Sequence, residues 1–163
     1  MLDSAPEVFV ALEGSGLGQA IRQSRWIYMA ANVGHVAALA VFAGAVAVLD
    51  LRLIGAFAAT APGRVLSGAR RAVIAAFAAL VLTGAMLFTA EASHVIMNRV
   101  FQLKLGLIAL GLINVTVFER FTAPKVRALP ASSPLPAAAR AAGMASLTVW
   151  LAVAICGRSI AYF

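Results

Sequence analysis

Residues 32–52 decide the fold, and they read NVGHVAALAVFAGAVAVLDLR. The segment is apolar almost throughout, although it begins with Asn32 and carries His35 one turn further on. About 20 apolar residues, each rising about 1.5 Å along a helix, cross the roughly 30 Å of hydrocarbon in a bilayer. The segment therefore predicts a membrane-spanning helix with an imidazole inside the membrane.

The whole chain has the same character. Of its 163 residues, 63% are hydrophobic and only 12% are charged. A water-soluble fold of this size has too little interior to bury so much apolar surface. The apolar runs predict one all-α domain over residues 1–163, an integral membrane four-helix bundle. Its spans are expected at about residues 26–49, 72–90, 100–118 and 141–160, the third with Lys104 near the interface.

The segments outside the spans differ in composition. Asp3 and Glu7 stand where a secretory signal needs positive charge, so residues 1–25 are expected to remain in the mature protein. A small apolar edge in this segment predicts a short interfacial helix on the membrane surface. Residues 119–140 contain four prolines and two adjacent serines, which predict an irregular cytoplasmic loop.

Basic residues are unevenly divided between the two ends of the predicted bundle. The loops after the first and third spans carry Arg52, Arg64, Arg70, Arg71, Arg120, Lys125, Arg127 and Arg140. The other end carries Arg22, Arg25, Arg99, Lys104 and Arg158. Because short loops rich in Lys and Arg stay on the cytoplasmic side, both termini are predicted to be periplasmic, with the chain in a bacterial inner membrane. The net charge of +7 does not indicate nucleic acid, since it is split among short loops without interleaved aromatic residues.

Polar side chains outside the cytoplasmic loops are predicted to gather at the periplasmic end of the bundle, because the first and third spans run inward and the other two run outward. This polar cluster comprises Asn32, His35, Glu91, His94, Lys104 and Arg158. An ionisable group inside a membrane normally faces protein or a cavity and has a partner. The cluster is therefore the candidate site.

The sequence leaves two interpretations of His35 open. The first is an interhelical hydrogen bond from a neutral imidazole. The second is metal ligation, either by His35 as an axial ligand of a b-type haem with His94 as the second ligand, or in a copper site that uses His35 or His94 with Met29, Met86 or Met97. Two axial imidazoles need their nitrogens about 4 Å apart across the iron. That geometry requires the second span to continue past residue 90 and to tilt.

Other residues carry simpler expectations. Cys156 is the only cysteine, so it cannot form an intramolecular disulfide and is predicted to be a packing residue. Asn114, inside the third span, predicts an interhelical hydrogen bond. Asp50 and Arg52, at the end of the first span, predict a local ion pair or a bond to the loop. No phosphate-binding loop, HExxH or GxSxG motif is present.

Three segments carry a family resemblance: RQSRWIYMAANVGHVAALAVFAGAVAVLDLRLIG (22–55), FQLKLGLIALGLINVTVFER (101–120) and WLAVAICGRSIAYF (150–163). They resemble a bacterial family of uncharacterised small four-helix inner-membrane proteins, a domain of unknown function. More distantly, the arrangement is similar to copper-resistance D-type membrane proteins. The resemblance implies the four-helix fold but no activity. Asn32 stands where that family often has an acid, and Glu119 where it often has a histidine, so His35 is the one ligand candidate that matches the family pattern.

The leading functional prediction is a non-catalytic membrane protein, either an accessory subunit of a larger membrane complex or a self-associating homo-oligomer. The alternative is a redox protein in which His35 holds haem b or copper near the periplasmic face. A channel or transporter is the third alternative, because no span contains the paired ionisable residues or the broken helix expected of an ion pathway.

Overall fold

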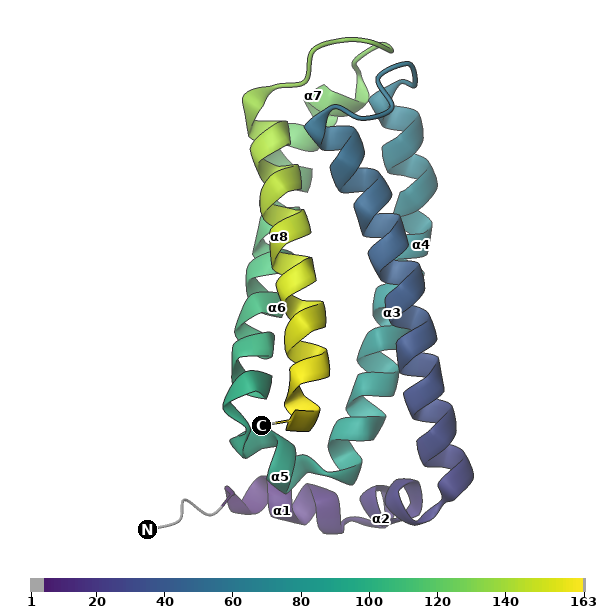
Figure 1. Cartoon of the computed structure of the whole chain (residues 1–163), viewed down its shortest axis with the longest axis vertical. Coiled ribbons are helices and arrows are strands. Elements are labelled where there is room, and N and C mark those ends of the chain that lie inside the picture. The colour runs from purple at the N-terminus through teal and green to yellow at the C-terminus, as the bar shows by residue number, and fades with distance from the viewer. Residues whose placement is uncertain (1–4, 163) are drawn as a thin grey trace.

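The computed structural model describes residues 5–162, and these form helices and turns with no β-strand among them. Four long helices run alongside one another, while α1, α2 and α5 lie across one end (Figure 1). In chain order the elements are α1 (Glu7–Gly14), α2 (Gly16–Gln23), α3 (Arg25–Ile54), α4 (Pro62–Ala90), α5 (Ala92–Met97), α6 (Arg99–Val117), the π-helix η1 (Phe118–Thr122), α7 (Ala123–Arg127), α8 (Ala137–Ser159) and the 3₁₀-helix η2 (Ile160–Tyr162). We call the end with α1, α2 and α5 the short-helix end, and the end with residues 55–61 and 128–136 the loop end.

Four helices are long and apolar enough to cross a membrane, which confirms this part of the prediction by length and composition. These helices extend beyond the predicted spans, over Arg25–Ile54, Pro62–Ala90, Arg99–Arg127 and Ala137–Tyr162. The second of these helices begins at Pro62 rather than at residue 72. Proline is tolerated in the first helical turn, because the backbone N–H groups of that turn have no partner within the helix.

The predicted irregular loop over residues 119–140 differs from the structure in its first part. The helix of the third span continues through η1 and α7 to Arg127, and only residues 128–136 are irregular. Pro124 lies in the first turn of α7, directly after the π-helix η1. The other three prolines of the segment lie beyond Arg127.

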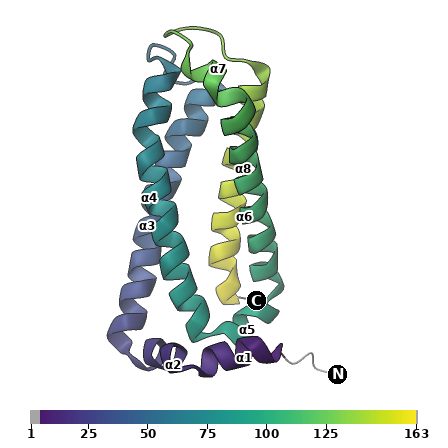
Figure 2. The ribbon, with the colours of Figure 1, turned by 180° about the vertical axis from the view of Figure 1, so that it is seen from behind.

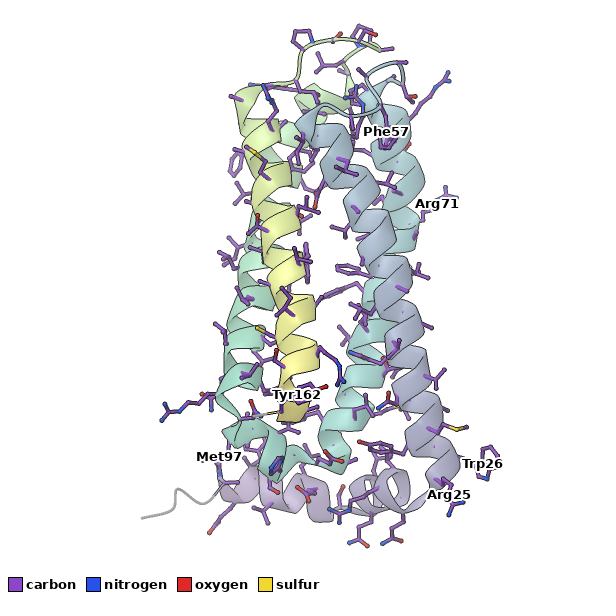
Figure 3. All side chains as sticks on the ribbon, viewed as in Figure 1. Arg25, Trp26, Phe57, Arg71, Met97 and Tyr162 are labelled. Carbon is purple, nitrogen blue, oxygen red and sulfur yellow. The ribbon has the colours of Figure 1, made fainter. Side chains whose placement is uncertain are left out.

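The predicted short N-terminal helix corresponds to α1, and a second short helix that was not predicted, α2, follows it in the structure. α1 ends at Gly14, and Ser15 caps α2 by accepting a hydrogen bond from the Gly18 amide at 3.1 Å. Gly18 lets α2 approach the end of α4 closely, since a Cβ at this position would lie 3.0 Å from the Thr89 carbonyl oxygen. Trp26 projects outward from the start of α3 and is 74% exposed (Figure 3).

The long helices pack as a series in which α4 contacts α3, α3 contacts α8, and α8 contacts α6. At the middle of the bundle, Trp150 of α8 lies edge-on to Phe42 of α3, with ring centroids 4.8 Å apart. Gly111 of α6 accommodates the same indole, because a Cβ there would lie 2.8 Å from Trp150 Cζ2. Trp150 thus joins the α3–α4 pair to the α6–α8 pair.

The fourth side of the bundle, between α4 and α6, is closed only near its ends. At the short-helix end, Phe88 of α4 stacks on Phe101 of α6 with ring centroids 5.5 Å apart. At the loop end, α4 packs on α7. Between these contacts, α4 and α6 are not a packed pair, and Figure 2 shows them standing apart with α8 behind.

Candidate functional site

His35 is bonded across the α3–α4 interface. Its Nδ1 lies 2.9 Å from Thr83 Oγ1, and the Thr83 hydroxyl donates its proton to the Ala79 carbonyl oxygen at 2.6 Å. Since that hydroxyl proton is already used, the hydroxyl oxygen accepts from Nδ1–H. We assign the imidazole proton to Nδ1 on this basis, which leaves Nε2 as an acceptor.

A glycine makes room for the imidazole. A Cβ on Gly84 of α4 would lie only 3.3 Å from His35 Cε1. The imidazole ring therefore lies against the backbone of Gly84, which is the residue after Thr83. The absence of a side chain at Gly84 lets α3 and α4 approach closely at this point. His35 is half-buried by this packing.

Lys104 lies against α8 in a similar way. A Cβ on Gly157 would be 3.4 Å from Lys104 Nζ, so the ammonium group lies over a glycine of the neighbouring helix. Among the described residues, no hydrogen bond or salt bridge to Lys104 is formed. Phe88 of α4 stacks on Phe101 of α6, and Thr83 and Lys104 lie a few residues further into the bundle along these two helices. His35, Thr83 and Lys104 thus form a polar layer that draws on three of the four long helices.

The remaining predicted residues lie outside this polar layer. Glu91 ends α4 and accepts a hydrogen bond from the Tyr28 hydroxyl at 3.0 Å. Arg158 is exposed and donates to the Tyr162 hydroxyl at 2.5 Å, with its guanidinium 4.8 Å from that ring's centroid. Figure 3 shows Tyr162 at the C-terminal end of α8. Each group therefore has a partner of its own.

Asn32 and His94 do not join His35. Asn32 is exposed on α3, and His94 is exposed on α5, which lies across the short-helix end (Figure 1). His35 is seven residues further along α3 than Tyr28, the partner of Glu91, which places His35 about 10 Å deeper in the bundle. His94 follows Glu91 in the chain and belongs to α5, so it lies nearer the short-helix end than His35 does.

A contact that the sequence did not reveal anchors α1 to α5. Glu13 accepts hydrogen bonds from the Ser93 hydroxyl and from the Ser93 amide, the latter at 2.9 Å, and forms a salt bridge with Arg22 at 2.6 Å. The hydrogen bonds from Ser93, assisted by Arg22, hold the pKa of Glu13 below its usual value. Eighty positions separate Glu13 from Ser93, so no local pattern in the sequence indicates this contact.

Several simpler predictions are confirmed. Asn114 donates to the Ala142 carbonyl oxygen at 3.1 Å, which is an interhelical hydrogen bond between α6 and α8. Cys156 is a buried, free cysteine. Arg52 bonds to the loop, with its Nε donating to the Thr60 carbonyl oxygen at 3.2 Å. Asp50 is also buried, but no ion pair joins it to Arg52 within the part of the chain that the structure describes.

The polar layer offers two groups to a ligand, an imidazole acceptor and an ammonium donor. No group of three His, Cys, Asp or Glu residues is placed to hold a metal ion within residues 5–162. Hydrogen bonding between helices is the chemistry that the described contacts perform.

Comparison with known proteins gives a family but no activity. No curated protein and no solved structure matches the chain significantly. A family model described as "Family of unknown function (DUF6644)" matches residues 9–163, which include all four long helices and the polar layer. The chain therefore belongs to this family of unknown function.

Proposed function

We propose that the protein is a non-catalytic integral membrane protein that acts through its helix surfaces, either as an accessory subunit of a larger membrane complex or as a self-associating bundle. The observation that carries this proposal is the unpacked side between α4 and α6. A four-helix bundle that is complete in itself packs each helix on two neighbours, whereas here α4 and α6 do not pair along their middle.

The residues on this side are apolar and exposed. On α4, Ile74 and Val81 share a face with Phe88 at seven-residue spacing, and they are 58% and 57% exposed. On α6, Leu105 and Leu112 share the face of Phe101 and are 46% and 41% exposed. Because Phe88 and Phe101 stack on each other, the two faces border the same opening. An apolar helix can pack on such a surface without leaving a polar group that lacks a hydrogen-bond partner.

Photo-crosslinking from within the membrane tests the proposal. A photoreactive phenylalanine derivative at Leu105 is expected to form adducts with a polypeptide, either a second copy or another chain, as the adduct mass shows. The same derivative at Leu151 of α8, which is 61% exposed, is the control and is expected to label lipid. If position 105 also labels lipid alone, the proposal fails.

We further propose that the chain lies in a bacterial inner membrane with both termini in the periplasm. The basic residues support this orientation, because the loop end carries Arg64, Lys125, Arg127 and Arg140 together with the other basic residues of its loops. Anionic lipid headgroups on the cytoplasmic side attract such loops.

A second candidate function is ligation of haem b or copper by His35, and one observation favours it. Ligating histidines commonly donate their other ring N–H to a neighbouring oxygen, which fixes the tautomer. His35 has this arrangement, since Nδ1 is held by Thr83 and Nε2 is an acceptor. The proposal assigns ligation to His35 alone, since His94 is exposed on α5.

The visible spectrum of protein purified in detergent from haem-replete cells tests this candidate. An intense absorption band that is lost in His35→Ala and kept in His94→Ala would support ligation by His35 alone. Metal analysis of the same preparation covers copper. A colourless preparation without metal would exclude this candidate and leave the first proposal in place.

A further inference from the structure

The loop end holds a cavity of about 230 Å³, on the opposite end of the molecule from the polar layer. Its lining includes Arg52, Gly55, Ser133, Pro134 and Arg140, and none of its lining residues is acidic. A water molecule occupies about 30 Å³ of the liquid. The cavity therefore has room for a group the size of a tetrahedral oxyanion.

Arg52 brings a buried positive charge to this cavity. Only 1% of its surface is exposed, and its Nη2 has no hydrogen-bond partner. Its Nε is bonded to the Thr60 carbonyl oxygen, which is neutral. A buried guanidinium normally has an anion to pair with. Among the described residues, no carboxylate forms a salt bridge with Arg52, although Asp50 lies two positions before it.

Two other arginines at this end, Arg70 and Arg127, share an acidic partner. Glu119 accepts from Arg127 at 2.6 Å and lies 3.9 Å from a guanidinium nitrogen of Arg70. Arg140, in contrast, lines the cavity and forms no salt bridge within the described part of the chain. The cavity therefore lies between two arginines that lack anionic partners.

The N-terminus of α8 adds to this positive potential. Pro136 is the N-cap residue, and no side chain caps the helix. The first amides of the 23-residue helix and its dipole are therefore available to an anion. Arg140 lies in the first turn of the same helix and lines the cavity. Pro134 and Leu135, which directly precede the N-cap residue of this helix, also line the cavity.

The two loops around the cavity are fixed to each other. The Ser132 amide donates to the Ala58 carbonyl oxygen at 2.7 Å, so the 128–136 loop is tied to the 55–61 loop. Phe57 and Ser132 have positive φ angles of 55° and 61°, a conformation that residues with a Cβ adopt only when their surroundings hold them there. The cavity is thus a formed feature of the loop end.

We propose that this cavity binds a phosphate-bearing anion, held by Arg52, Arg140 and the N-terminus of α8. Guanidinium groups bind phosphate oxygens through paired hydrogen bonds, and helix N-termini favour the same ligand. The phosphate group belongs either to an anionic phospholipid of the adjoining leaflet or to a soluble phosphate, since both present the same oxygens.

Thermal unfolding of the full chain in a neutral detergent tests this proposal. Phosphatidic acid is expected to raise Tm, whereas diacylglycerol with the same acyl chains is not. Inorganic phosphate, compared with chloride at equal ionic strength, distinguishes the two sources. A rise with phosphatidic acid alone identifies a lipid headgroup, and a rise with both probes identifies a site open to soluble phosphate.

Arg140→Gln is the decisive variant, because Arg140 is exposed and its loss leaves the core intact. The apparent affinity for phosphatidic acid is expected to fall about tenfold or more, as for the loss of a charged hydrogen-bond donor. Arg120→Gln is the matched control, since Arg120 is exposed near the same end but does not line the cavity. The proposal is overturned if neither probe raises Tm, or if both variants weaken binding equally.

Discussion

At the scale of single residues, polar side chains of the long helices are used to join helices. His35 bonds to Thr83, Tyr28 to Glu91, and Asn114 to a backbone carbonyl. In each case one partner comes from a different helix, so the polar atom is satisfied without water. Lys104 lacks such a bond among the described residues, which makes it the residue of the polar layer that is most available to a ligand.

Thr83→Val tests the bond to His35. Valine has nearly the shape of threonine but cannot accept from Nδ1–H, so the imidazole is left with an unpaired donor. We expect a loss of about 0.6–2 kcal/mol in the free energy of unfolding. The measurement is reversible unfolding in mixed micelles.

Thr116→Val is the matched control for this experiment. The Thr116 hydroxyl is exposed and donates only within its own helix, to the Leu112 carbonyl oxygen at 2.7 Å. A loss of similar size in both variants would show that threonine hydroxyls stabilise their own helices and that the His35 contact adds nothing.

The pKa of Glu13 gives a prediction on pH. Because Ser93 and Arg22 hold this pKa below its ordinary value, the ionised carboxylate favours the docked state of α1. This stabilisation is fully present above the ordinary pKa of about 4.5 and is lost as the pH falls through the lowered value. The protection of the α5 amides against hydrogen exchange, measured relative to their intrinsic exchange rate at each pH, should therefore fall at acid pH.

Glu13→Gln is expected to remove this pH dependence of the protection and to leave the α5 amides weakly protected at neutral pH as well. Glu7→Gln serves as the control, since Glu7 is exposed at the start of α1. If the Glu13→Gln variant keeps the pH profile of the parent protein, another group controls the docking of α1.

At the scale of helices, glycines set which pairs approach closely. Gly84 accommodates His35, Gly157 accommodates Lys104, and Gly111 accommodates Trp150. Lipid tails are as apolar as leucine, so helix association in a membrane depends on such close contacts. The long helices themselves could be predicted from hydropathy. These contacts could not, because they depend on the relative register of helices that are far apart in the chain.

Two boundaries show the limit of prediction at this scale. Arg70 and Arg71 made the first two turns of α4 resemble a loop, although a helix can continue past the hydrocarbon core into the headgroup region. Pro124 and the later prolines made 119–140 resemble one irregular segment, although only the first of them falls inside a helix. The hydrophobic composition indicates which part of a helix is apolar enough to cross a membrane. It does not indicate where the whole helix begins and ends.

Gly111→Ala tests the packing of α6 on α8. A Cβ would lie 2.8 Å from Trp150 Cζ2, and the indole cannot move freely because Phe42 and Phe77 lie against it. We expect a loss of about 1–3 kcal/mol in the free energy of unfolding, as for other overpacked cores. Circular dichroism during unfolding in mixed micelles measures it.

Gly106→Ala in the same helix is the control, because a Cβ there meets nothing within 4 Å. This variant should be unchanged or up to about 1 kcal/mol more stable, since alanine favours helix over glycine. Equal losses at positions 106 and 111 would contradict the packing explanation.

At the scale of the whole molecule, the two ends have different roles. The short-helix end joins its elements through specific polar contacts, such as the bond from Ser93 to Glu13. The loop end gathers arginines around a cavity and leaves Arg52 and Arg140 without anionic partners. The sequence predicted one polar cluster that included Asn32, His35 and His94. In the structure Asn32 and His94 are exposed, whereas His35 is half-buried against α4, because a position along a helix does not determine which way its side chain faces.

The proposed orientation follows from this asymmetry and can be tested with single-cysteine variants in a Cys156→Ala background. Leu17→Cys reports the short-helix end, where Leu17 is 65% exposed, and Ala59→Cys reports the exposed loop end. A maleimide that cannot cross the inner membrane should label Leu17→Cys in intact cells and label Ala59→Cys only after lysis. The opposite pattern would reverse the topology, and it would place the arginine-lined cavity against the outer leaflet, where anionic phospholipids are no longer its expected neighbours.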